Sequence, residues 1–162
     1  MRVGVTNIPP ISFQPLFYGI KERDMDALYD SIAGLGNFAM YFGISVLFLY
    51  IFKVVYAFVT PHDEWKLVKE EKNTAAAIGF GGALIGFAVA LSGAATNSVS
   101  LIDFAIWGGV AVIAQSLAFA LLRFTFMPKI AERISNNEVS AGTMLAATSV
   151  AVGLLNAACM TY

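Results

Sequence analysis

The sequence holds a single histidine, and it stands beside two acids in the charged stretch TPHDEWKLVKEEKN, residues 60–73. His62, Asp63 and Glu64 have the residue types of a metal site or an acid–base site. Adjacent residues on a helix point in different directions, however, so one metal ion cannot easily take all three. No second histidine or cysteine pair completes a zinc set. We therefore predict no metal site and keep His62 as a pH-sensitive candidate, because histidine changes charge near neutral pH.

A second group of candidates is polar and lies in or beside long apolar stretches. Gln115 stands near the middle of one stretch, where an amide needs a partner because water is absent. Asp103 fits a capping box with Ser100. It is also the only acid in three of the apolar stretches, residues 75–96, 104–127 and 140–161, and in the connection between the first two of these. If protons, ions or a small solute cross this protein, the candidate polar pathway is Asn97, Asp103, Gln115 and Asn156. Helix capping by Asp103 and a helix–helix hydrogen bond from Gln115 are the alternatives.

Two basic residues lie inside apolar stretches. Lys53 comes eight residues before Pro61, and Arg123 comes five before Pro128. Charges at membrane depth are costly, which makes both candidates for binding an anion or a carboxylate inside the bundle. The alternative is that the long side chains reach back to the headgroups.

These residues must be positioned by membrane helices. Of the 162 residues, 58% are hydrophobic and only 13% are charged, and the mean hydropathy is +0.72; a soluble domain carries about 25% charged residues. Each apolar stretch exceeds the ~20 residues that cross a bilayer. We predict an all-α membrane domain over residues 32–162 with four spans. The spans are residues 32–59, 75–96, 104–127 and 140–161.

Residues 1–31 form an N-terminal extension of different composition. Pro9, Pro10 and Pro15 interrupt any early helix. Residues 21–31 predict a short polar helix that leads into the first span. The apolar residues before it favour a partly interfacial segment, and a loose tail is the alternative.

Orientation follows from basic residues in short loops. The loop after the first span carries Lys66, Lys69 and Lys72, and the loop after the third carries Lys129 and Arg133. The connection between the second and third spans carries none. We call the loops after the first and third spans the first and second elbows. We predict that both charged elbows are cytoplasmic and that both termini are outside. A net charge of −1 gives no reason to expect nucleic-acid binding.

The two elbows resemble one another. Thr60 and Pro61 predict the start of a short interfacial helix, and Asn73 is placed to cap the second span. A large span, a proline, a base five residues later and an asparagine recur around Pro128. This pattern predicts two parallel two-helix repeats related by an axis along the membrane normal, with short interfacial helices in the cytoplasmic loops.

The second and fourth spans are rich in small residues, which let helix backbones approach closely in lipid. The predicted helix-packing residues are Gly79, Gly82, Gly86 and Gly153. We therefore place these two spans at protein seams and more of the first and third against lipid. The seams are internal, between subunits or both, and we expect a homo-oligomer.

Several stretches are similar to the YjfL family of bacterial inner-membrane proteins. They are PHDEWKLVKEEKNTAAA, SVSLIDFAIWGG, RFTFMP and LLNAACMTY. The resemblance covers about residues 32–162 and implies a four-span inner-membrane protein built from repeated two-span units. Ala90 stands where the family pattern would place a proline. The family's function is unknown, so the resemblance implies no catalytic residue; it implies only an association with membrane-stress and polyamine-related gene neighbourhoods.

The sequence leaves two classes of function open. The first is a small oligomeric transporter or channel for protons, ions or a small solute. The alternative is a membrane-organising or stress-associated scaffold that recruits partners through its cytoplasmic elbows. The sequence favours transport, because the polar groups in the outer half of the spans exceed what helix capping needs. We expect no enzyme and no cofactor, because the sequence has no nucleophile–base pairing, no metal spacing and no phosphate-binding loop.

Overall fold

The computed structural model describes the backbone of residues 14–60 and 64–160, and side chains from residue 25 onward within those ranges. The chain divides into two units, residues 1–40 and 41–162. Helix α1 (Gln14–Val59) begins in the first unit, and its first turn accepts Pro15 because no backbone N–H partner is needed there. The polar stretch 21–31 is continuous with the first span in one helix. His62 and residues 1–13 lie outside the described part of the chain.

Four helices are long and apolar enough to cross a membrane. They include α1, whose candidate span is Met25–Val59, and α3 (Thr74–Asn97). The third is α4 (Leu101–Leu121), which continues into the π-helix η1 (Leu122–Phe126), and the fourth is α6 (Val139–Cys159). Every regular element within residues 14–60 and 64–160 is helical. The predicted all-α, four-span architecture is therefore confirmed.

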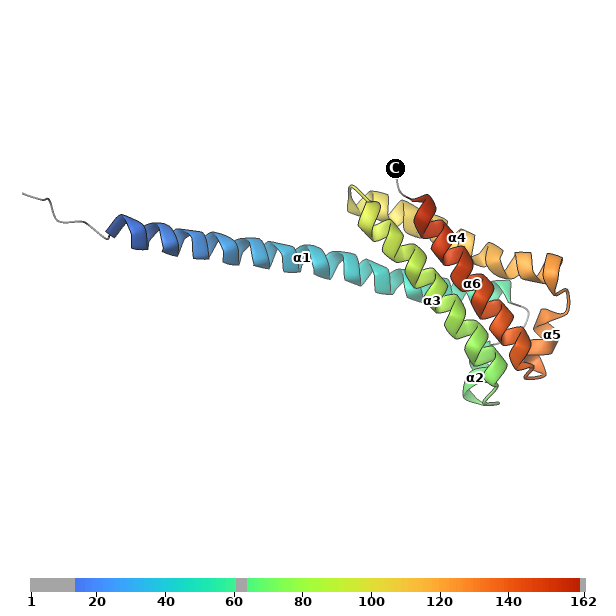
Figure 1. Ribbon diagram of the computed structural model, residues 1–162. Coiled ribbons are helices and arrows are strands. Elements are labelled where there is room, and N and C mark those ends of the chain that lie inside the picture. The colour runs from blue at the N-terminus through green and yellow to red at the C-terminus, as the bar shows by residue number, and fades with distance from the viewer. Residues whose placement is uncertain (1–13, 61–63, 161–162) are drawn as a thin grey trace, which may run out of the picture. The chain divides into compact units, whose positions relative to one another are not determined.

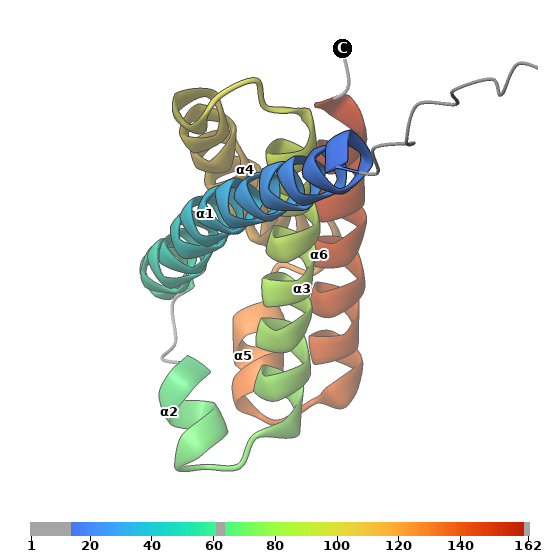
Figure 2. The same ribbon diagram turned by 90° about the vertical axis from the view of Figure 1, so that its left-hand side faces the viewer.

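Helices α3 and α6 lie side by side along their length (Figures 1 and 2). Their backbones approach closely because small residues meet there. A Cβ atom at Gly93 would lie 2.7 Å from the Cα of Ala157, and one at Gly82 would overlap Ala146. Contacts this short do not occur between real Cβ atoms, so glycine is required at both positions. The seam between the second and fourth spans is thus internal to one chain.

The end of α1 within the second unit packs through aromatic rings instead. Phe52 stacks on Phe87 of α3 with ring centroids 4.5 Å apart, and Phe48 meets Phe104 of α4 edge-on at 6.1 Å. Gly108 of α4 leaves room for Phe48, since a Cβ there would come within 2.7 Å of that ring. This interface keeps the backbones farther apart than the glycine seam does. Helix α4 also buries a larger share of its residues than α6, contrary to the expectation that the third span faces lipid more, because α4 packs against both α3 and α6.

Two short helices, α2 (Glu64–Lys69) and α5 (Ile130–Ser135), lie at the same end of α3 and α6 (Figure 2). Each precedes a long small-residue helix. The residue two places before that helix has a left-handed backbone in both cases: Lys72 with φ 52° and Asn137 with φ 58°. Short helices are therefore present in both elbows, as the sequence predicted. The symmetry axis between two repeats stays a prediction.

Candidate functional site

Gln115 lies at the junction of three helices in the middle of the bundle. Its side chain projects from α4 and is 1% exposed. The amide Nε2 donates to the carbonyl of Ser149 on α6 at 3.0 Å, and more weakly to that of Ala83 on α3 at 3.4 Å. Gly86 makes room for this contact, since a Cβ there would lie 2.7 Å from Nε2 and would overlap the Ser149 carbonyl. The buried amide therefore joins three helices.

The other candidate pathway residues lie at the far end of the bundle. Asp103 Oδ2 accepts from the backbone N–H of Val99 at 3.1 Å, and the Ser100 hydroxyl accepts from the Asp103 N–H at 3.2 Å. This reciprocal pair is the capping box that the sequence predicted. Asn97 donates to the carbonyl of Gly93 in its own helix at 2.9 Å. Twelve residues of α4 separate Asp103 from Gln115, about 18 Å along the helix. The structure therefore does not bring Gln115 together with Asp103.

Asn156 on α6 differs from Asp103 and Asn97, which form hydrogen bonds with nearby residues of the same segment. Its Nδ2 atom is buried and has no hydrogen-bond partner within the part of the chain that the structure describes. A buried amide donor without a partner costs about 1–3 kcal/mol. Such a group marks a place where a water or another chain would be accommodated.

The predicted packing glycines lie in the interface between α3 and α6. A Cβ at Gly79 would meet the side chain of Leu145 at 3.0 Å, and one at Gly153 would overlap the Gly86 carbonyl. Gly142, part of the same small-residue stripe, lies against the Ala75 carbonyl. These positions allow backbone-to-backbone contact along α3 and α6.

The two intramembrane bases have different surroundings. The Nζ atom of Lys53 lies 4.5 Å from the centroid of the Trp65 ring, and Lys69 Nζ lies 4.8 Å from it. Lys53 also lines a small pocket with the buried Glu64 of α2. Arg123 sits in η1 with its guanidinium 5.7 Å from the Phe124 ring. Lys53 therefore lies in a pocket that also contains a carboxylate.

The sequence did not single out Glu64 from its two neighbours. Its side chain is only 6% exposed, although it begins a short helix in a charged elbow. One signal was available: Leu67, three residues later on the same helical face, is an apolar residue that would be expected to pack inward. Leu67 is indeed buried, and Glu64 is buried with it.

The side chains of two asparagines form hydrogen bonds that connect the two elbows. The Oδ1 atom of Asn73 caps α3 by accepting from the Ala76 N–H at 2.8 Å, which confirms the predicted cap. Its Nδ2 atom crosses to the second elbow and donates to the Ile134 carbonyl at 2.8 Å. In return, Asn137 Oδ1 accepts from the Ala75 N–H at 3.1 Å. The start of α3 is thus held by one asparagine from each elbow.

An ion pair lies in the second elbow, outside the spans. Arg133 Nε donates to Glu138 Oε2 at 2.6 Å, its second guanidinium contact is to Glu138 Oε1, and the Ser140 hydroxyl also donates to Oε1. These hydrogen bonds, the one from Arg133 above all, lower the pKa of Glu138 from 4.5 to about 2. Glu138 is therefore ionised at neutral pH.

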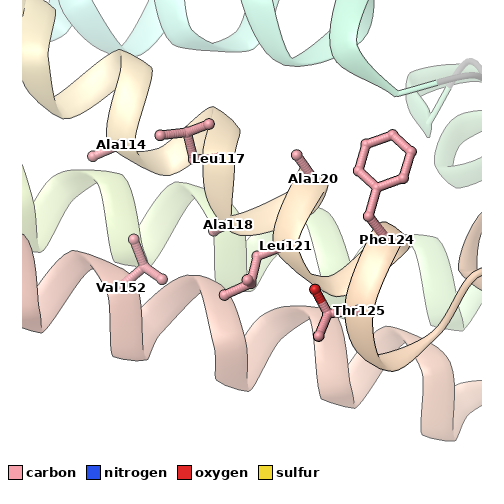
Figure 3. A pocket seen from close by; sticks show the side chains of 8 residues that line it. All are labelled: Ala114, Leu117, Ala118, Ala120, Leu121, Phe124, Thr125 and Val152. Atoms are coloured by element: carbon pink, nitrogen blue, oxygen red, sulfur yellow. The ribbon is translucent and has the colours of Figure 1, made fainter.

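An open apolar groove of about 560 Å³ runs beside α4, η1 and α6 (Figure 3). Thr125 supplies the one hydroxyl among its lining side chains, and Phe124 rises beside it. The remaining lining residues are Ala114, Leu117, Ala118, Ala120, Leu121 and Val152. Such a wall suits an apolar neighbour such as a lipid chain.

The fold and these contacts define a multi-span helical membrane protein. Most of the buried polar side chains described above form hydrogen bonds within the chain. Residues 30–160 match the family model described as Domain of Unknown Function (DUF350). The chain is 44% identical over 125 residues to the UPF0719 inner membrane protein YjfL of Escherichia coli (strain K12), covering 77% of this chain and 93% of that protein. It is 26% identical over 125 residues to the UPF0719 transmembrane protein YshE of Bacillus subtilis (strain 168), covering 76% of this chain and 92% of that one. No solved structure matches.

The chain belongs to the DUF350 family, and it is an integral inner-membrane protein. The resemblance to the YjfL family is thereby confirmed. Helix α3 continues through Ala90 without interruption, in keeping with the absence of a proline at that position.

Proposed function

We propose that this protein is a non-enzymatic, membrane-organising scaffold that assembles with copies of itself and recruits partners through its charged elbows. The observation that carries this proposal is the Gln115 junction. A polar group at that depth would line a pathway if it faced water, but its amide is 1% exposed and bonded to two neighbouring helices. Hydrogen bonds between membrane helices serve packing more often than conduction.

A second copy of the chain is the partner that the outer surface of α3 and α6 suits best. An open apolar groove of about 750 Å³ runs there, lined largely by small residues such as Ala77, Gly81, Ala147 and Ala151. A Cβ at Gly81 would meet nothing within 4 Å, so this surface leaves room for another helix to approach. Chemical crosslinking of the protein in native membranes tests the homo-oligomer. A single monomeric band after efficient crosslinking would remove this part of the proposal.

We further propose that the two elbows face the cytoplasm and that both termini face outward, because Lys66, Lys69 and Lys72 favour the cytoplasmic side. Cys159 is the only cysteine and is exposed near the end of α6. A membrane-impermeant maleimide should therefore label it in intact cells whose outer membrane has been permeabilised. As a matched control, Glu71→Cys in a Cys159→Ala background should react only after the inner membrane is broken. The opposite pattern would reverse the orientation.

The scaffold itself is tested by affinity purification in mild detergent. Partners that bind the first elbow should be lost when Lys66, Lys69 and Lys72 are all changed to Gln. They should be retained with Lys129→Gln, which removes a base from the other elbow. Identical sets of co-purifying proteins in the two variants would contradict recruitment through the first elbow.

A transporter or channel for protons, ions or a small solute is the second candidate, and Asn156 is the observation that favours it. Its buried donor has no partner within the described residues, and it could complete a polar path between copies of the chain. Flux through reconstituted liposomes tests this candidate with protons, Na⁺ and K⁺. Flux that falls in Asp103→Asn and Asn156→Leu would replace the scaffold proposal. Flux that both variants leave unchanged would remove these residues from the path.

A further inference from the structure

A buried carboxylate lies where the last turns of α1 meet α2. Glu64 is 6% exposed, and Tyr56, in the last turn of α1, is 1% exposed. The two side chains share a small void of about 30 Å³ with Lys53, Trp65 and Phe80. Three of the lining side chains, Tyr56, Trp65 and Phe80, are aromatic, and Lys53 and Glu64 supply the charged groups.

The void has room for about one water molecule, since a water needs some 10–15 Å³ of this kind of space. The Tyr56 hydroxyl lies near the Glu64 carboxylate, and within the described part of the chain no geometric hydrogen bond is made by this hydroxyl. A single water in the void would bridge the two groups. The described residues around the void offer fewer oxygens than the six or more that a calcium ion takes, but a carboxylate suffices for a proton.

Three elements surround the carboxylate, and two of them carry charged or titratable groups near it. Helix α1 contributes Lys53 and the phenol of Tyr56, α2 contributes Lys69 beside Trp65, and α3 contributes only the uncharged Phe80. His62 and Asp63 precede Glu64 in the sequence but lie outside the described residues. Burial favours the neutral carboxyl, whereas the Lys53 ammonium favours the carboxylate.

We propose that Glu64 is a proton-binding site, which takes up and releases one proton through the void that it shares with Tyr56. On uptake, the carboxylate receives a proton from solvent water and becomes a neutral carboxyl group. On release, the carboxylate is again available to the Lys53 ammonium. This site is tested separately from the scaffold and from transport, because neither proposal assigns a role to Glu64 or Tyr56.

The position of Lys53 beside Trp65 allows the protonation of Glu64 to be followed by fluorescence. Its ammonium group lies over the Trp65 ring at 4.5 Å, an arrangement that a neutral Glu64 permits. An ionised Glu64 competes with the ring for the same ammonium. The fluorescence of Trp65 should therefore follow the protonation of Glu64.

The test uses the full chain in lipid nanodiscs. The sequence has two tryptophans, so Trp107→Phe leaves Trp65 as the only one. We expect a fluorescence transition whose midpoint lies above the ordinary glutamate value of about 4.3, because burial favours the neutral carboxyl group. Glu64→Gln should abolish the transition. Glu71→Gln, which neutralises an exposed carboxylate of the same elbow, should leave it in place.

Two further variants separate Glu64 from its neighbours. His62→Gln should keep the transition, and its loss in that variant would assign the titration to His62 and overturn the proposal. Lys53→Met should raise the midpoint, because the cation that favours the carboxylate is gone. An unchanged midpoint would overturn the role of Lys53.

Infrared difference spectroscopy of wild-type protein with ¹³C-labelled glutamate tests the site without relying on Glu64→Gln to fold. The carbonyl band of a protonated, buried glutamic acid should appear as the pH is lowered, at the same midpoint as the fluorescence change. Titration of all glutamates near pH 4.3, with no such band above it, would overturn the proposal.

Discussion

The close backbone approach between α3 and α6 predicts very different effects for two glycines five residues apart. Gly86 faces α6, where an added Cβ would overlap the Ser149 carbonyl and press on the Gln115 amide at 2.7 Å. Gly81 lies on the same helix, but an added Cβ there meets nothing within 4 Å. Gly86→Ala and Gly81→Ala therefore make the same chemical change in different surroundings.

The expected magnitudes follow from three contributions. Alanine is favoured over glycine in a helix by up to about 1 kcal/mol, and both variants receive this benefit. Overpacking typically costs about 1–3 kcal/mol, and here the obstructing atoms belong to a backbone that cannot rotate away. Displacing the Gln115 amide removes interhelical hydrogen bonds worth on average about 0.6 kcal/mol each in membranes. We expect Gly86→Ala to lower the free energy of unfolding by about 1–3 kcal/mol and Gly81→Ala to leave it unchanged or raise it slightly.

Reversible unfolding in mixed detergent micelles, followed by tryptophan fluorescence, measures both variants against the wild type. The comparison is internally controlled, because the two substitutions share the helix and the added methyl group. If their free energies of unfolding agree within about 0.5 kcal/mol, the usual range for substitutions outside tight contacts, the proposed close seam is wrong.

The other contacts give three shorter predictions. Gln115→Leu should reduce the free energy of unfolding by about 1 kcal/mol in the same assay, and an unchanged value would show that the amide does not hold the helices. Asn73→Ala should cost about 1–2 kcal/mol and speed hydrogen exchange at the start of α3, whereas Asn136→Ala, at an exposed position, should do neither. The hydrogen bonds from Arg133 lower the pKa of Glu138 from 4.5 to about 2, so their contribution to stability is complete above about pH 4.5 and is lost as the pH falls toward 2. Glu138→Gln should flatten stability over that acid range; an unaltered pH dependence would contradict the ion pair.

Hydropathy and capping patterns predicted the framework of the molecule because both are local. Four apolar stretches gave the four spans, and Asn73 and the Ser100–Asp103 pair marked two helix starts that the structure confirms. The start of α1 is less marked in sequence, because proline in a first turn is compatible with a helix. The polar residues of 21–31 therefore belong to the same helix as the first span.

Contacts between distant segments could not be predicted in the same way. The sequence showed that Gln115 needs a partner, but the choice of the Ser149 carbonyl depends on how α4 meets α6. Asn137 likewise caps α3 from the other elbow, 62 residues away from Ala75. The burial of Glu64 depends on how α2 folds back toward α1, although the nearby Leu67 gave a partial local signal.

The two kinds of interface suggest where the protein can respond to its surroundings. Between α3 and α6 glycines hold backbone against backbone, and such a contact has little freedom to change without being lost. Between α1 and its neighbours the contacts are aromatic side chains such as Phe52 and Tyr56, which can shift by rotation. Glu64 lies at the second kind of interface, so its protonation should act on the joint between α1 and α2. Hydrogen exchange compared on either side of the Glu64 midpoint should therefore change in α2 and stay constant in the middle of α3 and α6. A uniform change through all three helices would show that the glycine seam is not the rigid part of this protein.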